Sequence, residues 1–402
     1  MKQIIIIGGG AAGFFCASNL DEKKYSITIL EQNSDVLQKV KISGGGRCNV
    51  THACFDPREL VQFYPRGNKE LLSVFTKFQP GDTMDWFDQR SVPLKIENDN
   101  RVFPESNSSQ TIINTFQTEI QNKKVEVKTK CSVKEIEKQG EKYLVKTSLG
   151  DFQADYVVYT TGSSPKSLKI IENLGHKIVD LVPSLFTFNI KDELLQDIPG
   201  TSFENAEISI PALKTEESGP LLITHWGLSG PAVLKISAWE AISLAKSKYH
   251  FEIEVNFISK SMDEAEESFH NFKQSNPKKT IGQAKIFDVT NRFWQKVLDV
   301  SKVDLNKQVS QISGKEMQKI LENLCRKKLK VTGKSTFKDE FVTAGGVDLK
   351  EINFKNMTSK LLPNFHIAGE VLNIDAVTGG FNFQACWSEG WLISQHLNHL
   401  EI

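Results

Sequence analysis

The sequence has no excess of charge of either sign, because its 402 residues include 49 Lys and Arg residues and 49 Asp and Glu residues. This balance argues against a general electrostatic attraction to nucleic acid or to an anionic membrane. No apolar run approaches the ~20 residues of a transmembrane helix. The block at residues 4–7 is too short for a signal peptide and is followed at once by glycines. We therefore expect a cytoplasmic protein that binds a small-molecule substrate, without nucleic acid or membrane partners; the oligomeric state stays open.

Cysteine is scarce and scattered. The six cysteines form no C-x-x-C pair, so the spacing of a zinc site or a disulfide scaffold is lacking, and we predict no metal site. Cys48 and Cys54 follow a glycine-rich stretch and raise the alternative of a redox-active disulfide. Six residues of separation would put them about 240° apart on a helix, at ~100° per residue, which argues against that pair.

What the sequence does contain is a nucleotide-binding pattern near its start, the motif G-x-G-x-x-G. Gly8 permits a tight turn, Gly10 lets a pyrophosphate approach the backbone, and Gly13 lets helix and strand pack closely. The N-terminus of the following helix offers free N–H groups to the phosphates. The predicted phosphate-binding residues are Gly8, Gly10, Ala11, Ala12 and Gly13.

The motif lies in the context that it requires. Residues 2–7 and 26–30 are typical of buried parallel strands, and residues 11–20 are typical of a helix. The second strand ends in Glu31, 18 residues after Gly13, where an acid accepts hydrogen bonds from an adenosine ribose and repels the 2′-phosphate of NADP. We predict a dinucleotide site that also includes Gln32; a glycine-rich surface turn is the alternative.

A second glycine-rich stretch covers residues 41–51. Three consecutive glycines are costly inside a helix or a strand, so we predict a loop whose N–H groups face a ligand, with Lys39, Lys41 and Arg47 supplying positive charge. A plain mobile loop is the alternative. The predicted contacts are Lys39, Ser43, Gly44, Gly45, Gly46, Arg47, Cys48 and Asn49.

Ligand-binding chemistry returns near the C-terminus. Gly379 and Gly380 precede a final helix, predicted at residues 383–400, with Asn382 near its N-cap. Glu370 and Asp375 are placed to bond the hydroxyls of a polyol. Earlier in the chain, a buried strand at 156–160 ends at Thr161 and Gly162, as at the ligand-binding edge of a parallel sheet. A dinucleotide with a polyol near acids and a ring facing a helix end indicates FAD.

The pattern of predicted secondary structure changes around residue 185. Short alternating strands are predicted at 186–190, 206–213, 221–224 and 249–258, with a helix at 232–246. Further helices are predicted at 71–87, 109–122, 263–272, 281–300 and 315–329, and strands at 125–133, 340–343 and 365–368. We predict an FAD-binding domain of residues 1–185 and 336–402, a β-rich subdomain of residues 186–260 and a helical subdomain of residues 261–335.

The segment 315–338 carries eight basic residues against two acids. A patch for nucleic acid or for the phosphate of NADPH is one interpretation. A solvated helix face is favoured, because no aromatic residues are interleaved with the basic ones.

Five blocks together resemble the BaiN/YhiN-type bacterial flavoprotein family, whose members are described as NAD(P)/FAD-dependent oxidoreductases or as aminoacetone-oxidase-like. The blocks are GGGAAG at 8–13, KISGGGRCN at 41–49, THWGLSGP at 224–231, TAGGV at 343–347, and AGE at 368–370 with GGFN at 379–382. The resemblance implies an α/β fold: a Rossmann-like FAD-binding domain of the two-dinucleotide-binding type, formed by both chain ends, with an inserted strand-rich and helical domain. It also implies FAD contacts at Glu31, the 43–49 loop, the Val133 backbone, Gly369, Gly380, Phe381 and Asn382.

The resemblance guides the functional prediction, since one branch of the family is linked to reduction of a carbon–carbon double bond in bile-acid intermediates. We predict an FAD-dependent oxidoreductase that uses NAD(P)H to reduce a small organic substrate such as an enone. No second G-x-G-x-x-G follows Gly162, so NAD(P)H would bind only transiently. The alternatives are a flavin oxidase or dehydrogenase of an amine, an FAD disulfide reductase, and a non-catalytic flavin-binding protein.

The loop at 224–231 contains the candidate acid–base group. His225 exchanges a proton near neutral pH and is followed by a shaped Gly- and Pro-containing turn. A structural histidine bonded to the backbone of that turn is the alternative. His52, Tyr64 and Arg66 are weaker candidates.

Overall fold

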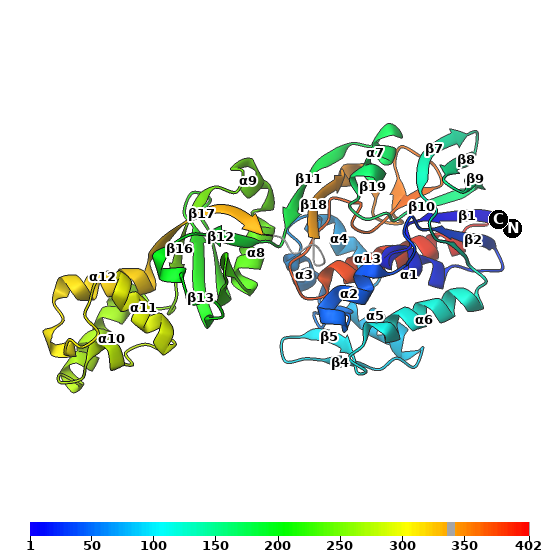
Figure 1. Cartoon of the computed structure of the whole chain (residues 1–402). Helices are drawn as coiled ribbons and strands as arrows, with labels where there is room; N and C mark the ends of the chain where they lie inside the picture. Colours follow the sequence, from blue (N-terminus) through cyan, green and yellow to red (C-terminus); the bar gives the residue numbers. More distant parts are fainter. Residues whose placement is uncertain (336–341, 402) are drawn as a thin grey trace. The chain divides into compact units, whose positions relative to one another are not determined.

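The computed structural model describes residues 1–335 and 342–401, which divide into two compact units (Figure 1). Unit 1 comprises residues 1–182 and 338–402, and unit 2 comprises residues 183–337. The predicted boundaries were 185/186 and 335/336. Residue 336 lies outside the described residues, as do Lys338 of the basic segment and the first two residues of the strand predicted at 340–343.

Unit 1 is built on a seven-stranded sheet in the order β19-β20-β21-β10-β1-β2-β6. The strands from β21 to β6 run parallel, and β19 and β20 add an antiparallel edge. The central strand β1 is covered on both faces, so that Ile4, Ile5 and Ile6 are fully buried, which explains its unbroken apolar sequence. The strands are β1 (Lys2–Ile7), β2 (Tyr25–Leu30), β6 (Glu126–Lys128), β10 (Tyr156–Tyr159), β19 (Ile352–Asn353), β20 (Thr358–Ser359) and β21 (Phe365–Ile367).

The first and last helices of unit 1 pack against each other. Helix α1 (Ala11–Asn19) meets α13 (Phe381–Asn398) at Gly390, where a Cβ would lie 2.8 Å from the carbonyl oxygen of Ala12. Only glycine permits this approach. The two chain ends are therefore joined in one unit. The other helices are α2 (Gln38–Gly46), α3 (Pro57–Leu60), α4 (Asn68–Phe75), α5 (Pro80–Asp88), α6 (Ser109–Asn122), α7 (Pro165–Asn173), and the 3₁₀ turns η1 (Val61–Phe63) and η5 (Leu349–Glu351).

Three small antiparallel or two-stranded sheets complete unit 1. They are β3 (Thr51–His52) with β5 (Arg101–Pro104) and β4 (Leu94–Ile96); β7 (Val133–Gln139) with β8 (Lys142–Thr147) and β9 (Gly150–Ala154); and β11 (Ile178–Ser184) with β18 (Val342–Val347).

Unit 2 contains a closed barrel in the order β12-β15-β14-β13-β16-β17. Its hydrophobic core is continuous with that of the adjoining helices: the ring of Phe293 on α11 lies 4.8 Å from that of Phe203 on β13. The predicted β-rich and helical subdomains therefore share one core. The strands are β12 (Thr187–Ile190), β13 (Ser202–Ile210), β14 (Thr215–Ile223), β15 (Gly227–Ser229), β16 (Phe251–Asn256) and β17 (Lys327–Ser335). The helices are α8 (Pro231–Trp239), α9 (Ala241–Lys246), α10 (Met262–Ser275), α11 (Asn291–Val300), α12 (Gly314–Cys325), η2 (Glu193–Leu195), η3 (Ile281–Gln283) and η4 (Val309–Gln311).

Several predicted helices are wrong in extent, while the one at 109–122 is confirmed by α6. The helix predicted at 71–87 is two helices, because Pro80 starts α5 behind a capping box formed by Gln79 and Asp82. The helix predicted at 281–300 begins only at Asn291, where the Thr290 side chain accepts from the Phe293 N–H. The helix predicted at 232–246 breaks at Glu240. Local caps divided these segments.

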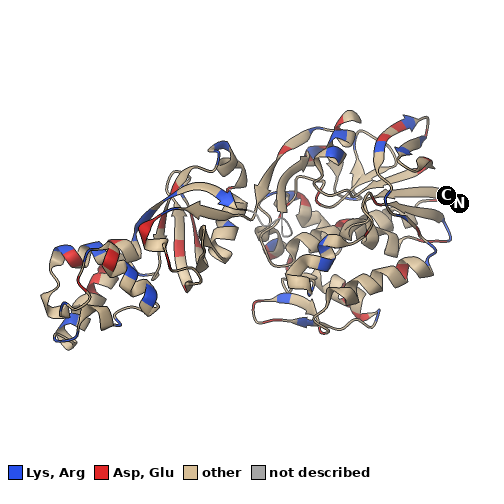
Figure 2. Ribbon diagram, viewed as in Figure 1, with Lys and Arg blue, Asp and Glu red and all other residues tan. Residues whose placement is uncertain are grey.

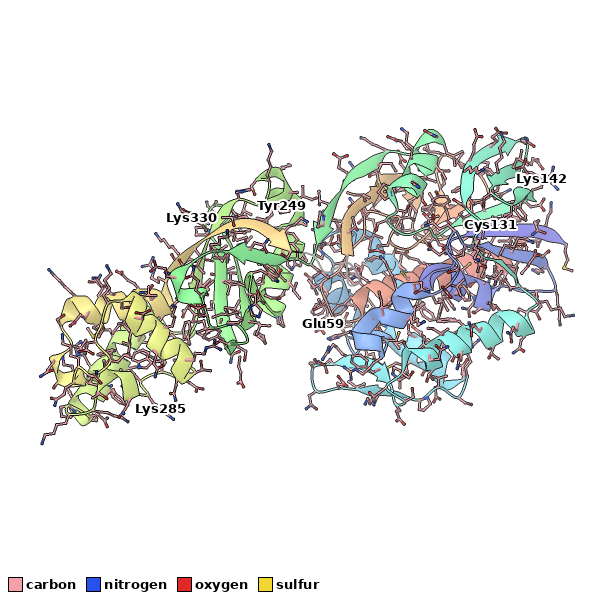
Figure 3. The ribbon with its side chains drawn as sticks, in the orientation of Figure 1. Glu59, Cys131, Lys142, Tyr249, Lys285 and Lys330 are labelled. Carbon is pink, nitrogen blue, oxygen red and sulfur yellow. The ribbon has the colours of Figure 1, made fainter. Side chains whose placement is uncertain are left out.

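The helix predicted at 315–329 is wrong only in its last four residues. Helix α12 ends at Cys325, and β17 then closes the barrel by pairing with β16 and β12. Lys328 and Lys330, the latter labelled in Figure 3, stand opposite Glu254 and Glu252 of β16, so opposite charges pair across the strands. The basic segment is thus partly a strand with acidic neighbours, and Figure 2 shows acidic and basic residues interspersed over unit 2.

In the described part of the chain, no helix is long and apolar enough to cross a membrane. Within the same residues, no group of three His, Cys, Asp or Glu side chains is arranged to hold a metal ion.

Candidate functional site

The glycine-rich turn between β1 and α1 is closed on its protein side and open at Gly10. Gly8 has φ 113°, and a Cβ there would lie 2.4 Å from the Thr160 carbonyl oxygen. A Cβ on Gly13 would lie 2.3 Å from the Gly8 carbonyl oxygen, whereas one on Gly10 would meet no atom within 4 Å. Gly10 is also the N-cap of α1 and has no side chain to bond the first-turn N–H groups. The turn therefore has the free donors and the space that a pyrophosphate needs.

Glu31 lies directly behind this turn, at the end of β2. One of its carboxylate oxygens accepts from the Gly9 N–H at 2.8 Å, and the other accepts from the backbone and side-chain N–H groups of Asn33. The carboxylate is buried, which fixes its position at the sheet edge where the predicted ribose contact would form.

A hollow beside Glu31 brings together residues from distant parts of the chain. Glu31, Gln32, Val133 and Thr161 all line it, although they come from the ends of β2 and β10 and the start of β7. Cys131, labelled in Figure 3, lies in the same wall. The lining residues of α7 and of the turn before β7 were not predicted from the sequence. Their position after the carboxyl ends of parallel strands was the available signal. These missed residues are Cys131, Ser132, Lys166, Ser167 and Ile170.

The glycine-rich loop predicted at residues 41–51 begins later than expected, at Ser43 near the end of α2. Helix α2 continues through Ile42, and the backbone leaves the helical region at Ser43, with ψ 150°, and at Gly44 and Gly45, with φ 58° and 67°. The three glycines are therefore a turn, as expected, at the end of a helix. Gly45 and Gly46 have open space where a Cβ would stand, which leaves their backbone accessible to a ligand.

Arg47 pairs with a neighbouring acid, and the two nearby cysteines are buried. The Arg47 guanidinium pairs with Glu97 at 2.7 Å and lies 3.9 Å over the Phe103 ring, so its charge is directed to the β4–β5 hairpin. Cys48 and Cys54 are unpaired and buried, and burial raises the pKa of the Cys48 thiol to about 12. Burial of both thiols thus disfavours the thiolate that a redox-active disulfide pair needs.

Asn49 connects this loop to the C-terminal helix. With its amide oriented to satisfy both neighbours, the side-chain oxygen accepts from the Gly380 N–H at 3.0 Å and the nitrogen donates to Thr51 O at 3.0 Å. Gly380, with φ 90°, is the N-cap of α13. The two predicted ligand-facing glycine segments therefore lie next to each other.

Protein side chains and backbone already contact the two C-terminal acids and Asn382. Asp375 is completely buried and ion-paired with Arg66, which replaces the predicted bond to a polyol. Asn382 lies two residues after the N-cap Gly380, near the cap as predicted, and its amide bonds both backbone groups of Ala376. Glu370 remains at the surface of the site and pairs with Lys39. Arg66 and Asn382 thus shape the segment 375–382.

His225 belongs to unit 2, in the turn between β14 and β15. The Thr224 hydroxyl, not His225, accepts the N–H groups of Trp226 at 3.3 Å and Gly227 at 3.2 Å. His225 is exposed and its side chain has no hydrogen-bond partner among the described residues. The turn is thus built without it, contrary to the structural alternative.

Unit 1 contains a histidine of its own at the ligand-facing segments. The His52 ring stacks on Phe381 with a centroid distance of 4.5 Å, and its Cδ2 would lie 3.4 Å from a Cβ on Gly379. Burial lowers the pKa of His52, and its Nδ1 has no hydrogen-bond partner among the described groups. His52 is therefore the neutral imidazole closest in the fold to the start of α13.

The residues of unit 1 fit FAD. The open Gly10 turn and the α1 N-terminus would hold the pyrophosphate, and Glu31 with the neighbouring hollow would hold the adenosine. The 43–46 turn and the Gly380 end of α13 would face the ring. The remaining predicted contacts, Gly162, Gly369 and Phe381, lie in the same unit.

Comparison with known proteins agrees with this reading. The chain is 25% identical over 408 residues to the Ribosomal RNA dihydrouridine synthase of Escherichia coli, covering 98% of this chain and 97% of that protein. It is 23% identical over 406 residues to the 3-dehydro-bile acid delta(4,6)-reductase of Clostridium scindens, covering 98% of each. Its fold resembles that of 3-ketosteroid delta1-dehydrogenase from Sterolibacterium denitrificans, with a TM-score of 0.52 and 9% identity over 99% of this chain and 100% of that one.

These comparisons confirm the predicted fold class and cofactor family. A family model described as HI0933-like protein Rossmann domain matches residues 2–396, and the chain belongs to this family of FAD-dependent flavoproteins.

Proposed function

We propose that this protein is an FAD-dependent reductase of a carbon–carbon double bond that is conjugated with a carbonyl group. The observation that carries the proposal is that two full-length relatives with different named substrates share this chemistry. Dihydrouridine is uridine with the double bond next to its C4 carbonyl reduced, and a 3-dehydro delta(4,6) bile acid has its double bonds conjugated with the 3-ketone. The enone predicted from the sequence belongs to the same class.

The chain's own residues would bind and orient the reactants. FAD, when bound and reduced by the electron donor, would supply the hydride for the electron-poor carbon of the double bond. The α13 N-terminus directs its positive end toward the segment where Gly380 and Asn49 meet, and this end stabilises negative charge on a ring placed there. The other carbon of the double bond needs a proton, and His225 is the proposed donor because its imidazole is exposed and unbonded.

The electron donor is proposed to be NAD(P)H. The only G-x-G-x-x-G motif of the sequence is occupied by the predicted FAD site, so the nicotinamide would bind transiently to reduce the flavin and then leave. The repulsion of a 2′-phosphate by Glu31 concerns the FAD site only and does not select between NADH and NADPH as donor.

A second candidate substrate is a uracil base of ribosomal RNA. It is favoured by the Ribosomal RNA dihydrouridine synthases of Escherichia coli and of Haemophilus influenzae, each 25% identical to this chain over 97% or more of its length. The reaction class is unchanged, but the partner would be the nucleic acid that the balanced charge argued against. Only a substrate assay distinguishes the two candidates.

The test is an anaerobic half-reaction experiment. The FAD-loaded protein is reduced with NADH, NADPH or dithionite and mixed with a 3-keto-4-ene steroid, with cyclohexenone, or with unmodified ribosomal RNA. We expect reoxidation of the flavin by at least one conjugated substrate and a product that has gained two hydrogens. Reoxidation by none of them, with rapid reoxidation by O₂ or by a disulfide, would contradict the proposal and favour an oxidase or a disulfide reductase.

A further inference from the structure

Unit 1 contains a buried acid that the predicted cofactor contacts do not use. Glu389 lies on α13, one residue before the glycine that packs against α1, and its side chain is completely buried. One carboxyl oxygen accepts from the Gly369 N–H at 2.5 Å. The other oxygen is buried and has no hydrogen-bond partner among the described residues. An unpaired buried acid is costly, which calls for a specific role.

Its position is directly behind the dinucleotide turn. Gly369, which donates to Glu389, is so close to α1 that a Cβ on it would lie 3.3 Å from the Ala12 Cβ and 3.7 Å from the Cys386 sulfur. Ala12 is in the first turn of α1, whose N–H groups face the predicted pyrophosphate. Glu389 therefore bonds the backbone segment that packs against the first turn of α1, where the cofactor's two negative charges would lie.

Among the residues that the structure describes, no cation pairs with Glu389 to hold it ionised. The titratable groups facing it are Cys386 on its own helix, Tyr64 on the segment after η1, and Glu370 with Lys39 beyond Cys386; Cys16 lies on the facing turn of α1. Burial raises the pKa of Cys16, Cys386 and Tyr64, so these groups stay neutral. The charge of Lys39 is matched by its pair with Glu370.

We propose that Glu389 is a positioning residue of the FAD site that binds a proton together with the cofactor. In its neutral form the carboxyl group anchors the Gly369 N–H and leaves the site free of a second negative charge. An ionised Glu389 would repel the pyrophosphate across a dry protein layer, where charges interact strongly. Protonation of Glu389 and binding of FAD therefore favour each other by the same factor.

Burial of Glu389 makes this coupling possible and also brings the titration of the carboxyl group into a pH range that can be measured. Desolvation raises the pKa of Glu389 to about 8, although the Gly369 hydrogen bond opposes the shift. The bound pyrophosphate raises the pKa of Glu389 further. At pH values between the pKa of Glu389 in the apoprotein and its pKa in the FAD complex, binding of FAD requires uptake of one proton. The affinity for FAD therefore falls by up to tenfold per pH unit in this range.

The experiment measures FAD binding to the apoprotein between pH 7 and pH 9. For the wild type we expect the Kd to rise about fivefold to tenfold over this range. Glu389→Gln keeps the shape and an acceptor for Gly369 but cannot ionise, so its Kd should change no more than about twofold. Glu126→Gln removes an exposed carboxylate from β6 and serves as the matched control, with the wild-type profile expected.

A second measurement needs no variant. When FAD is added to the wild-type apoprotein in weak buffer at pH 8.5, about half a proton or more per bound FAD should be taken up. No proton uptake, or a Glu389→Gln profile that parallels the wild type, would overturn the proposal. Both readouts are independent of substrate reduction, so they do not depend on the function proposed above.

Discussion

The carboxylate of Glu31 accepts a hydrogen bond from the Gly9 amide at 2.8 Å, joining the end of β2 to the turn that follows β1. The same carboxylate holds Asn33 through its second oxygen. A single acid thus sets the geometry of the phosphate turn and closes one wall of the adjacent hollow.

The first prediction concerns this acid. Glu31→Ala should weaken FAD binding by about 1.5–3 kcal/mol, or ~10- to 100-fold, because charge-assisted hydrogen bonds to the turn and to the ribose are lost. Glu31→Gln, which keeps an acceptor for Gly9, should lose less. Fluorescence titration of the apoproteins with FAD measures both. Equal affinity of the wild type and both variants for FAD would show that Glu31 does not contribute to the FAD site.

Two glycines of the turn should respond differently to the same methyl group. In Gly13→Ala the new Cβ would meet the Gly8 carbonyl oxygen at 2.3 Å, so the apoprotein should lose about 2–3 kcal/mol of unfolding free energy. In Gly10→Ala no protein atom lies within 4 Å of the Cβ, so stability should change by only about 1 kcal/mol.

The Gly10→Ala protein should instead bind FAD at least ~10-fold more weakly, since the methyl group fills the space of the pyrophosphate. Urea unfolding and FAD titration of both variants make the comparison. A destabilised Gly10→Ala apoprotein with normal FAD affinity would show that the space at Gly10 is not the phosphate site.

Glu389 should also shape the stability of the apoprotein. Burial raises its pKa from the ordinary value of 4.5 to about 8. As pH rises from 4.5 to 8, the carboxyl ionises in the unfolded chain and stays protonated in the folded one. The unfolded state then binds fewer protons, so stability falls across this window and the loss is complete above pH 8.

Glu389→Gln removes this loss, so its stability relative to the wild type should increase by on the order of 3 kcal/mol between pH 5 and pH 8. Urea unfolding at several pH values tests this difference. Parallel pH profiles of the two apoproteins would mean that Glu389 titrates normally in the folded protein.

Replacement of His225 should slow the reduction of substrate without affecting the stability of the protein. Because the side chain is exposed and unbonded, His225→Asn should change the unfolding free energy by less than about 0.5 kcal/mol. Reduction of substrate by the reduced flavin should slow by ~10²- to 10⁴-fold, as expected for loss of a general acid, while reduction of the flavin by NAD(P)H stays unchanged.

His250→Asn is the matched control for that experiment. His250 is an exposed histidine of the same unit whose Nδ1 contacts the Lys248 carbonyl oxygen at 2.8 Å, and its replacement should leave both half-reactions intact. If His225→Asn behaves like this control, His52 becomes the next residue to test as the proton donor.

The sequence by itself determined the β-α-β unit that carries the predicted nucleotide site, because that unit is local. Strand β1, the glycine turn, α1, β2 and Glu31 all lie within 31 consecutive residues, and each position has a short-range steric or electrostatic reason. Helix α6 was predictable for the same kind of reason, since Ser108 caps it and its apolar residues repeat at helical spacing.

Only the tertiary structure decided the parts that depend on distant neighbours. The pairing of β12 with β17 joins residues 187–190 to residues 331–335. The same strand β17 includes residues 327–329, which the sequence pattern predicts as the end of a helix. Asp375 is a plausible polyol contact in the sequence, but in the fold it forms an ion pair with Arg66, 309 positions away. Glu389 has no local signature at all, and only the approach of α13 to α1 buries it beside Gly369. Burial and long-range pairing arise from packing, which a periodic pattern does not contain.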